Sequence, residues 1–336
     1  MPARDTAPPS ITCVMPAYNE AANLPHVVPH VLEALLALSP QVELLIVDDG
    51  SRDGTADVVR ELCRSHPQCV LLELSRNFGK EAAISAGLEQ ARGDVTVIMD
   101  ADGQHPTDLL PDMLRHWQAG ADMVYAVRTS RDDQRGLHIG LIGWFYRLVN
   151  WRSRVQIPPN AGDFRWMDRT VVAALNALPE RNRFMKGLYA WVGYRTVALP
   201  YQPLDRHSGV TRFNWHSSLQ LGLAGMMSFS TLPLRLMTVS GLLLAFFSLL
   251  YGLWIVLDVL IGGKDVPGFA TIATAVMFFS GVQLLSIGLL AEYVGRIYDE
   301  VKRRPLFIVR ERVGQGLDPD HDPAAAPQPP QSARPR

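Results

Sequence analysis

Short apolar runs alternate with amphipathic stretches over the first 130 residues. The runs have the length of strands buried on both faces of a sheet, and the stretches repeat apolar positions at helical spacing. Alternation of this kind predicts an α/β domain with a doubly wound, mostly parallel sheet. The predicted strands are Ile11–Met15, Val42–Val47, Val70–Leu74, Val95–Met99 and Met123–Val127. The predicted helices are Ala21–Leu38, Thr55–Ser65, Lys80–Ala91 and Leu109–Gln118.

The pattern becomes less regular after Val127. It predicts helices over Leu137–Trp151 and Phe184–Val192, and strands over Gly162–Asp168 and Arg195–Tyr201. Apolar and aromatic residues with few charges then fill 213–233, which is typical of helices in a membrane interface or of ordinary domain core.

Two uncharged runs near the C-terminus, Met237–Leu257 and Gly268–Ala291, are long enough to cross a bilayer. The alternative is a pair of long buried helices in a soluble core. The connection between the runs is short, so they are predicted to form a hairpin. Arg235 precedes the first run and basic residues follow the second, which predicts that both outer ends lie in the cytoplasm. The N-terminus has no apolar signal segment, so the large N-terminal domain is expected to be cytoplasmic too.

Composition narrows the class of protein further. The formal net charge is −1, so nothing points to nucleic acid as a partner. The three cysteines have no C-x-x-C spacing and are expected to be reduced, without a metal.

Four predicted strands end in unusual polar sequences. Because the carboxyl ends of parallel strands meet at one edge, these sequences are expected to form one ligand site. They are PAYNE (Pro16–Glu20), DDGSRDGT (Asp48–Thr55), SRNFGKEAA (Ser75–Ala83) and DADGQHP (Asp100–Pro106).

Some of these polar residues have simpler explanations. Asn19 and Asp53 are each interpreted first as helix caps. Asp48 and Asp49 are harder to explain this way, because two adjacent acids at the end of a buried strand repel each other unless one binds a donor. A ligand base or ribose hydroxyl would be such a donor.

Asp100 and Asp102 form a D-x-D pair, which by itself means little, since 318–322 contains two more such pairs. Their position at the end of a buried strand distinguishes them. Carboxylate oxygens held close together suit Mg²⁺ or Mn²⁺, with substrate phosphates completing the coordination. Gln104 could add a neutral oxygen, and His105 could instead hold the loop.

The order of these motifs resembles glycosyltransferase family 2, and in particular its polyprenyl-phosphate glycosyltransferases. That branch includes dolichol-phosphate mannose synthases and bacterial undecaprenyl-phosphate sugar transferases with two C-terminal transmembrane helices. Further matching stretches are GDFRWMDR (Gly162–Arg169), RFMKGLYAWVG (Arg183–Gly193) and LLAEYVGRIYDEVKRRPLFIV (Leu289–Val309).

The resemblance implies a GT-A domain over 10–212 after a flexible N-terminus at 1–9. Interface helices would follow at 213–233, and transmembrane helices at 234–262 and 267–292. A basic cytoplasmic segment at 293–313 and a disordered tail at 314–336, rich in Pro, Ala, Asp and Gln, would complete the chain.

The resemblance also implies roles for particular residues. Asp100 and Asp102, with Gln104, would hold the metal and the donor diphosphate. Arg128, Arg206 and Arg212 would hold the acceptor phosphate; the alternative is that these arginines are solvated surface charges. The catalytic residues would be Asp100, Asp102, Arg128 and Arg206. The residues implied to bind the nucleotide sugar are Pro16, Tyr18, Glu20, Asp48, Asp49 and Gln104.

The implied reaction is metal-dependent, inverting transfer of a sugar from a nucleotide sugar to polyprenyl phosphate at the inner, cytoplasmic membrane. UDP is the expected carrier, with GDP as the alternative, and glucose, mannose, galactose, an N-acetylhexosamine or a modified pentose each fits. Self-association, as a tetramer, would be consistent with the resemblance. The competing hypotheses are a processive polysaccharide synthase, whose Q-x-x-R-W motif is absent from the sequence, and a non-catalytic membrane scaffold.

Overall fold

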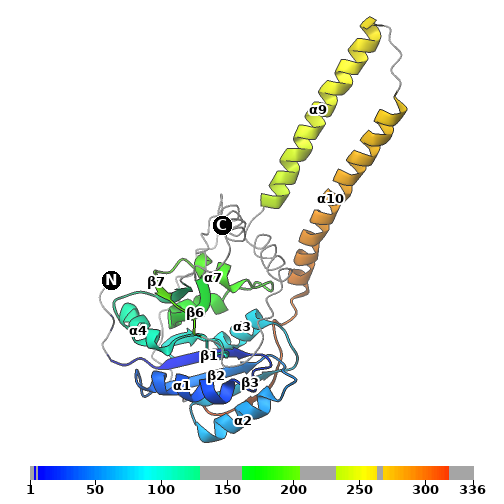
Figure 1. Cartoon of the computed structure of the whole chain (residues 1–336). Helices are drawn as coiled ribbons and strands as arrows, with labels where there is room; N and C mark the ends of the chain where they lie inside the picture. The colour runs from blue at the N-terminus through cyan, green and yellow to red at the C-terminus, as the bar shows by residue number, and fades with distance from the viewer. Residues whose placement is uncertain (1–3, 5–6, 129–160, 205–231, 263–267, 318–336) are drawn as a thin grey trace, which may run out of the picture. The chain divides into compact units, whose positions relative to one another are not determined.

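The computed structural model describes residues 4, 7–128, 161–204, 232–262 and 268–317 (Figure 1). The chain divides into two compact units, residues 1–215 with 305–336 and residues 216–304. The predicted helix over Leu137–Trp151 and nearly all of the predicted interface segment 213–233 lie outside the described residues.

The described part of the first unit contains an eight-stranded sheet in the order β7-β5-β6-β4-β1-β2-β3-β8. Strands β1 to β5 and β7 run parallel to one another, and β6 and β8 run antiparallel to their neighbours. The mostly parallel α/β sheet predicted from the apolar pattern is therefore confirmed. The strands are β1 Ile11–Ala17, β2 Val42–Asp48, β3 Cys69–Leu74, β4 Val95–Ile98, β5 Met123–Arg128, β6 Ala161–Asp168, β7 Thr196–Tyr201 and β8 Val309–Val313.

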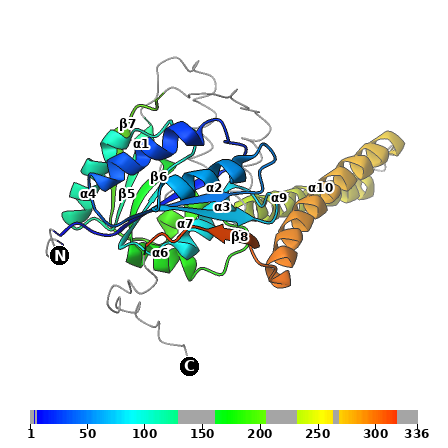
Figure 2. The same cartoon turned by 90° about the horizontal axis from the view of Figure 1, so that it is seen from below.

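Helices cover both faces of the sheet (Figures 1 and 2). Helices α1, α2 and α4 lie on one face, and α3, α6 and α7 on the other (Figure 2). Strands β1 to β3 are buried along their whole length, which explains their continuous apolar sequence. The helices are α1 Leu24–Leu36, α2 Thr55–Ser65, α3 Lys80–Gln90, α4 Leu110–Gln118, α6 Arg169–Asn176 and α7 Met185–Trp191, with a 3₁₀ turn η1 at Thr107–Leu109.

Strand β6 is inserted antiparallel between β4 and β5. Its register places Arg165 opposite Ile98, so the start of β6 lies at the same edge as the carboxyl end of β4. An antiparallel strand thus brings its first residues to the edge where the parallel strands end.

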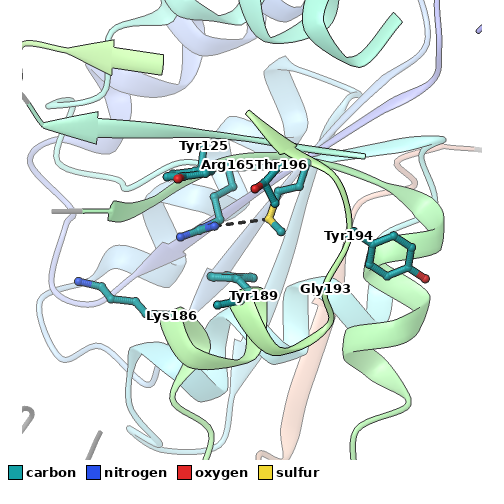
Figure 3. A pocket seen from close by; sticks show the side chains of 9 residues that line it. Tyr125, Arg165, Lys186, Tyr189, Gly193, Tyr194 and Thr196 are labelled. Atoms are coloured by element: carbon teal, nitrogen blue, oxygen red, sulfur yellow. Dashed lines mark hydrogen bonds between the residues drawn. The ribbon is translucent and has the colours of Figure 1, made fainter. Parts of the chain in front are cut away.

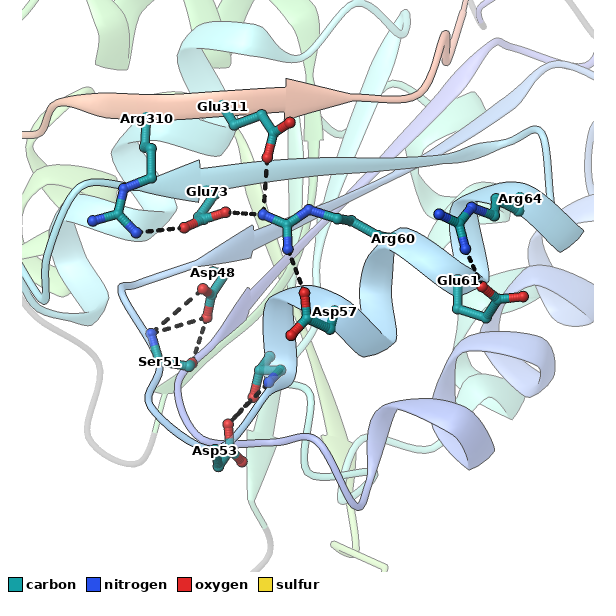
Figure 4. A network of polar contacts seen from close by, with 11 residues as sticks. Asp48, Ser51, Asp53, Asp57, Arg60, Glu61, Arg64, Glu73, Arg310 and Glu311 are labelled. Atoms are coloured by element: carbon teal, nitrogen blue, oxygen red, sulfur yellow. Dashed lines mark hydrogen bonds and ion pairs between the residues drawn. The ribbon is translucent and has the colours of Figure 1, made fainter.

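The apolar pattern did not predict strand β8. It pairs with β3 and is the outermost strand on that side of the sheet. Its side chains join a network of charges drawn in Figure 4. Arg310 Nη1 lies 2.8 Å from Glu73 Oε1, Arg60 pairs with the other Glu73 oxygen, and Glu311 lies 2.8 Å from Arg60 Nη2. Glu73 is 6% exposed, so two arginines compensate a buried charge.

The second unit contains two long helices, α9 (Leu232–Gly262) and α10 (Phe269–Lys302). Both are long and apolar enough to cross a membrane. Their large apolar side chains are exposed rather than packed in a core; Leu249, for example, is 74% exposed. Within the described residues, this contradicts the alternative of two buried helices in a soluble core and fits a membrane hairpin.

Candidate active site

A cavity of about 300 Å³ lies at the carboxyl edge of the parallel strands. It is formed where the loops after β1, β2, β3 and β4 meet, as the four polar sequences predicted. Its lining residues are Pro16, Ala17, Tyr18, Glu20, Asp49, Asn77, Gly79, Lys80, Ala83, Asp100, Ala101 and Asp102.

The loop after β1 is tied to the loop after β2. Asn19 has a left-handed backbone (φ 56°), and its side-chain oxygen accepts a hydrogen bond from the Arg52 amide at 2.9 Å. Asn19 is therefore not the cap of α1, which the structure places at Asn23. The Asp53 carboxylate does accept from the Thr55 amide at the start of α2, and also from the Ala21 amide. These contacts hold Pro16, Tyr18 and Glu20 at the cavity wall.

Asp48 and Asp49 both find partners within the chain. The Asp48 carboxylate accepts from the Ser51 amide and hydroxyl (Figure 4). Asp49 accepts from the amides of Phe78 and Gly79 at 2.7 and 2.9 Å, which orders the loop before α3. Burial raises the pKa of both carboxyls. Of the two, only Asp49 lines the cavity.

The loop after β4 is held by His105. The ring is 7% exposed, stacks on Phe164 at 4.8 Å, and accepts at Nδ1 from the Asp100 amide at 3.0 Å. Burial lowers the pKa of His105, so the neutral ring is favoured, with its proton on Nε2. The hydrogen bond from the Asp100 amide fits the loop-holding role considered for His105.

Lys80, the first residue of α3, bridges two acids. Its Nζ lies 2.7 Å from Asp100 Oδ1 and 2.9 Å from Asp163 Oδ2. Burial opposes charge on Lys80, but the two carboxylates raise its pKa. Burial likewise opposes charge on Asp100, and Lys80 and His105 hold its pKa below the ordinary value.

Sequence reasoning missed Lys80 and Asp163 as site residues. Asp163 reaches the site only because β6 is antiparallel to β4. Arg165 lies opposite Ile98, so Asp163, two residues earlier in β6, lies level with Asp100, two residues after Ile98. The only signal was an isolated acid at the start of an aromatic strand, inside the motif GDFRWMDR.

Arg128, at the end of β5, reaches the D-x-D loop. Its Nη2 donates to Gln104 Oε1 at 3.1 Å, and its Nε donates to Tyr201 Oη at 3.3 Å. Gln104 is thus engaged with the arginine and does not line the cavity. Arg206 and Arg212 lie outside the described residues.

The residues present fit a divalent metal. Asp100 and Asp102 line one cavity and supply hard carboxylate oxygens, the donors that Mg²⁺ and Mn²⁺ prefer. Among the described residues, no group of three or more His, Cys, Asp or Glu side chains could hold a metal. Two protein carboxylates suffice only for an ion that takes its other ligands from water and substrate phosphates.

An acidic cavity at the carboxyl ends of the parallel strands is where open α/β sheets bind their ligands. The profile of glycosyl transferase family 2 matches residues 12–175, and that of a GtrB C-terminal hairpin matches residues 232–297. The chain belongs to glycosyl transferase family 2, as the motif order indicated, and carries the hairpin at its C-terminal end.

Similar proteins span nearly the whole chain. The SfII prophage-derived bactoprenol glucosyl transferase of Shigella flexneri is 42% identical over 301 residues, covering 90% of this chain and 97% of its own. An uncharacterized glycosyltransferase of Synechocystis is 42% identical over 304 residues, covering 90% and 96%. Among solved structures, the mannosyltransferase PcManGT of Pyrobaculum calidifontis, in complex with GDP-Man and Mn²⁺, is 20% identical with a TM-score of 0.47 over 88% of each chain.

Proposed function

We propose that this chain is a membrane-anchored glycosyltransferase that moves a sugar from a nucleotide sugar to a polyprenyl phosphate. The observation that carries the proposal is the convergence of Asp100 and Asp102 with Pro16, Tyr18 and Glu20 on one cavity. Relatives named bactoprenol glucosyl transferase, similar over nine tenths of the chain, support a polyprenyl acceptor. The same names favour glucose among the possible sugars. The carrier is proposed to be UDP, as the resemblance implies.

Different residues of the cavity would bind different parts of the nucleotide-sugar donor. Pro16, Tyr18, Glu20 and Asp49 would surround the nucleoside, with Asp48 ordering the loop behind them through Ser51. Asp100 and Asp102 would hold Mg²⁺ or Mn²⁺, which supplies positive charge for the leaving diphosphate when bound. Lys80 and Asp163 lie beside Asp100, where the sugar would enter.

The acceptor phosphate would bind beside the D-x-D loop. Its oxygens are already anionic at neutral pH, so attack on the anomeric carbon needs no strong base. Arg128 offers a guanidinium at the end of β5, held by Gln104 and Tyr201, and bidentate contacts with a phosphate are favoured there. Arg206 and Arg212 are proposed to complete this phosphate site.

The hairpin of α9 and α10 explains why such a site would belong to a membrane protein. A polyprenyl tail cannot leave the bilayer, so the enzyme must bind the lipid's phosphate at the membrane surface. Arg235 in the first turn of α9, with Lys302, Arg303 and Arg304 at the end of α10, favours a cytoplasmic location for the catalytic domain, at the inner membrane.

A donor screen tests the proposal. Purified full-length protein in detergent receives Mg²⁺ or Mn²⁺, a polyprenyl phosphate and each nucleotide sugar in turn. Release of nucleoside diphosphate that requires the lipid, with one sugar per lipid product, is expected. Sugar chains longer than one unit would indicate a processive synthase, and no release with any donor would indicate a scaffold.

A further inference from the structure

A second cavity, of about 160 Å³, lies between β5, β6, β7 and helix α7 (Figure 3). It shares no lining residue with the acidic cavity. Met123 and Thr196, at the starts of β5 and β7, lie along its wall, so it extends toward the opposite edge of the sheet. The family motifs assign it no ligand.

Arg165 of β6 is the central feature of this second cavity. It is 3% exposed, and its guanidinium lies between the rings of Tyr125 and Tyr189, 5.0 and 4.1 Å from their centroids. Its hydrogen bonds go to the Gly162 carbonyl and, weakly, to the Met123 sulfur. Within the described residues Arg165 forms no ion pair, and Asp163, whose charge acts on Arg165, is itself paired with Lys80.

Other partly buried arginines in the same domain are better satisfied. Arg183 donates to three backbone carbonyls, and Arg169 donates to two. A guanidinium has five N–H donors, so Arg165 retains unused donors in a place where water is scarce. A buried charge of this kind needs an anionic partner or strong hydrogen bonds.

Two further groups of the second cavity favour an anion. The Tyr189 hydroxyl is buried and, among the described residues, has no hydrogen-bond partner. Lys186 lines the same cavity, and Figure 3 shows its side chain extending on the side toward which the Arg165 guanidinium points. Two cationic side chains, Arg165 and Lys186, therefore line one small cavity, and the Tyr189 ring lies against the guanidinium.

We propose that the second cavity binds a phosphate group. Two positive charges match a dianion, and a guanidinium can contact a phosphate through two hydrogen bonds. At about 30 Å³ for each water, the cavity has the volume of about five waters. That volume admits inorganic phosphate or the phosphate of a small monoester and excludes a nucleotide sugar.

Calorimetric titration of the full-length protein in detergent, with EDTA present, tests the proposal. EDTA removes divalent metal, so the acidic cavity cannot retain phosphate through a cation. Arg128→Met, titrated alongside, weakens the proposed acceptor-phosphate site and should still bind phosphate saturably. Saturable binding of inorganic phosphate is expected in the natural protein, in Asp102→Asn and in Arg115→Met, which removes an exposed charge of α4. At least tenfold weaker binding is expected in Arg165→Met and in Lys186→Glu.

Lys186→Glu changes a residue on the cavity rim and decides the matter if Arg165→Met does not fold. Titration with glycerol 3-phosphate tests whether the natural ligand is a phosphate monoester or free phosphate. If it is a monoester, both titrants should bind. If it is free phosphate, only inorganic phosphate should bind. Absence of saturable binding of either titrant, or equal binding by Lys186→Glu, would overturn the proposal. Neither result depends on whether the protein transfers a sugar.

Discussion

The ammonium of Lys80 lies 2.7 Å from Asp100 Oδ1, in the acidic cavity where a divalent cation is proposed to bind. The same ammonium lies 2.9 Å from Asp163. Lys80 therefore bridges the carboxylates of Asp100 and Asp163. A metal on Asp100 would have to compete with this lysine or share the carboxylate with it.

Replacing Lys80 is expected to strengthen metal binding. In Lys80→Met the competing charge is gone, and a single nearby charge at a protein surface contributes enough to change the affinity for Mn²⁺ by about tenfold. Titration of Mn²⁺ followed by electron paramagnetic resonance measures the change without any turnover. Arg64→Met, which removes an exposed charge of α2, should leave the affinity unchanged. Weaker binding in Lys80→Met would show that the lysine supports the metal site instead.

Removing a proposed metal ligand should abolish transfer and leave the fold intact. Asp102→Ala is expected to lower kcat by about a thousandfold or more, because charge on the leaving diphosphate is no longer stabilised. Circular dichroism and the thermal midpoint should match those of the natural protein. Asp112→Ala, an exposed acid of α4, is the control. Normal turnover in Asp102→Ala would refute the metal assignment.

Arg128 should act on the acceptor rather than on the donor. Arg128→Met is expected to lower kcat/KM for polyprenyl phosphate by about a hundredfold, since a charge-assisted, bidentate contact is lost. Arg128→Lys should restore only part of the loss, because lysine lacks the planar fork. Equal loss for the nucleotide sugar, measured as a weaker donor Kd, would move Arg128 to the donor site.

Glu81 makes stability depend on pH. Burial, followed by the nearby Asp163, raises its pKa to about 7. The folded protein thus holds a proton that the unfolded chain releases near its ordinary pKa, so this contribution to stability is complete at low pH and is lost as pH rises through about 7.

The corresponding variant is Glu81→Gln, which keeps an oxygen for the Met185 amide. It should be more stable than the natural protein at pH 8, by about 3 kcal/mol at most, and similar to it at pH 5. Thermal midpoints between pH 5 and 8.5 measure this. A constant difference across that range would contradict the prediction.

The docking of β8 should depend on Gly314. Its φ is +102°, and an added Cβ would overlap the backbone carbonyl of Cys69. Gly314→Ala is expected to destabilise the domain by about 3 kcal/mol, combining backbone strain with the loss of strand pairing. Gly54 has φ +88° but open space around it, so Gly54→Ala should show the strain alone, about 1 kcal/mol. Equal thermal midpoints for the two variants would show that β8 is not held there.

The sequence by itself predicted the strands β1 to β7, the order of the motifs and the apolar hairpin. Each depends on local periodicity or on residues within one loop, so each can be recognised without tertiary contacts. The family, the mostly parallel sheet and the meeting of the loops followed from the same local signals.

Only the tertiary structure showed the partners of these residues. Asp163 and Lys80 meet Asp100 because β6 runs antiparallel between β4 and β5, and strand order is set by packing between distant segments. β8 pairs with β3 across more than two hundred residues, and its charged, exposed sequence has no apolar period to mark it as a strand. Arg165 looked like an ordinary motif residue. Its burial, with no ion pair to the part of the chain that the structure describes, depends on α7 covering β6.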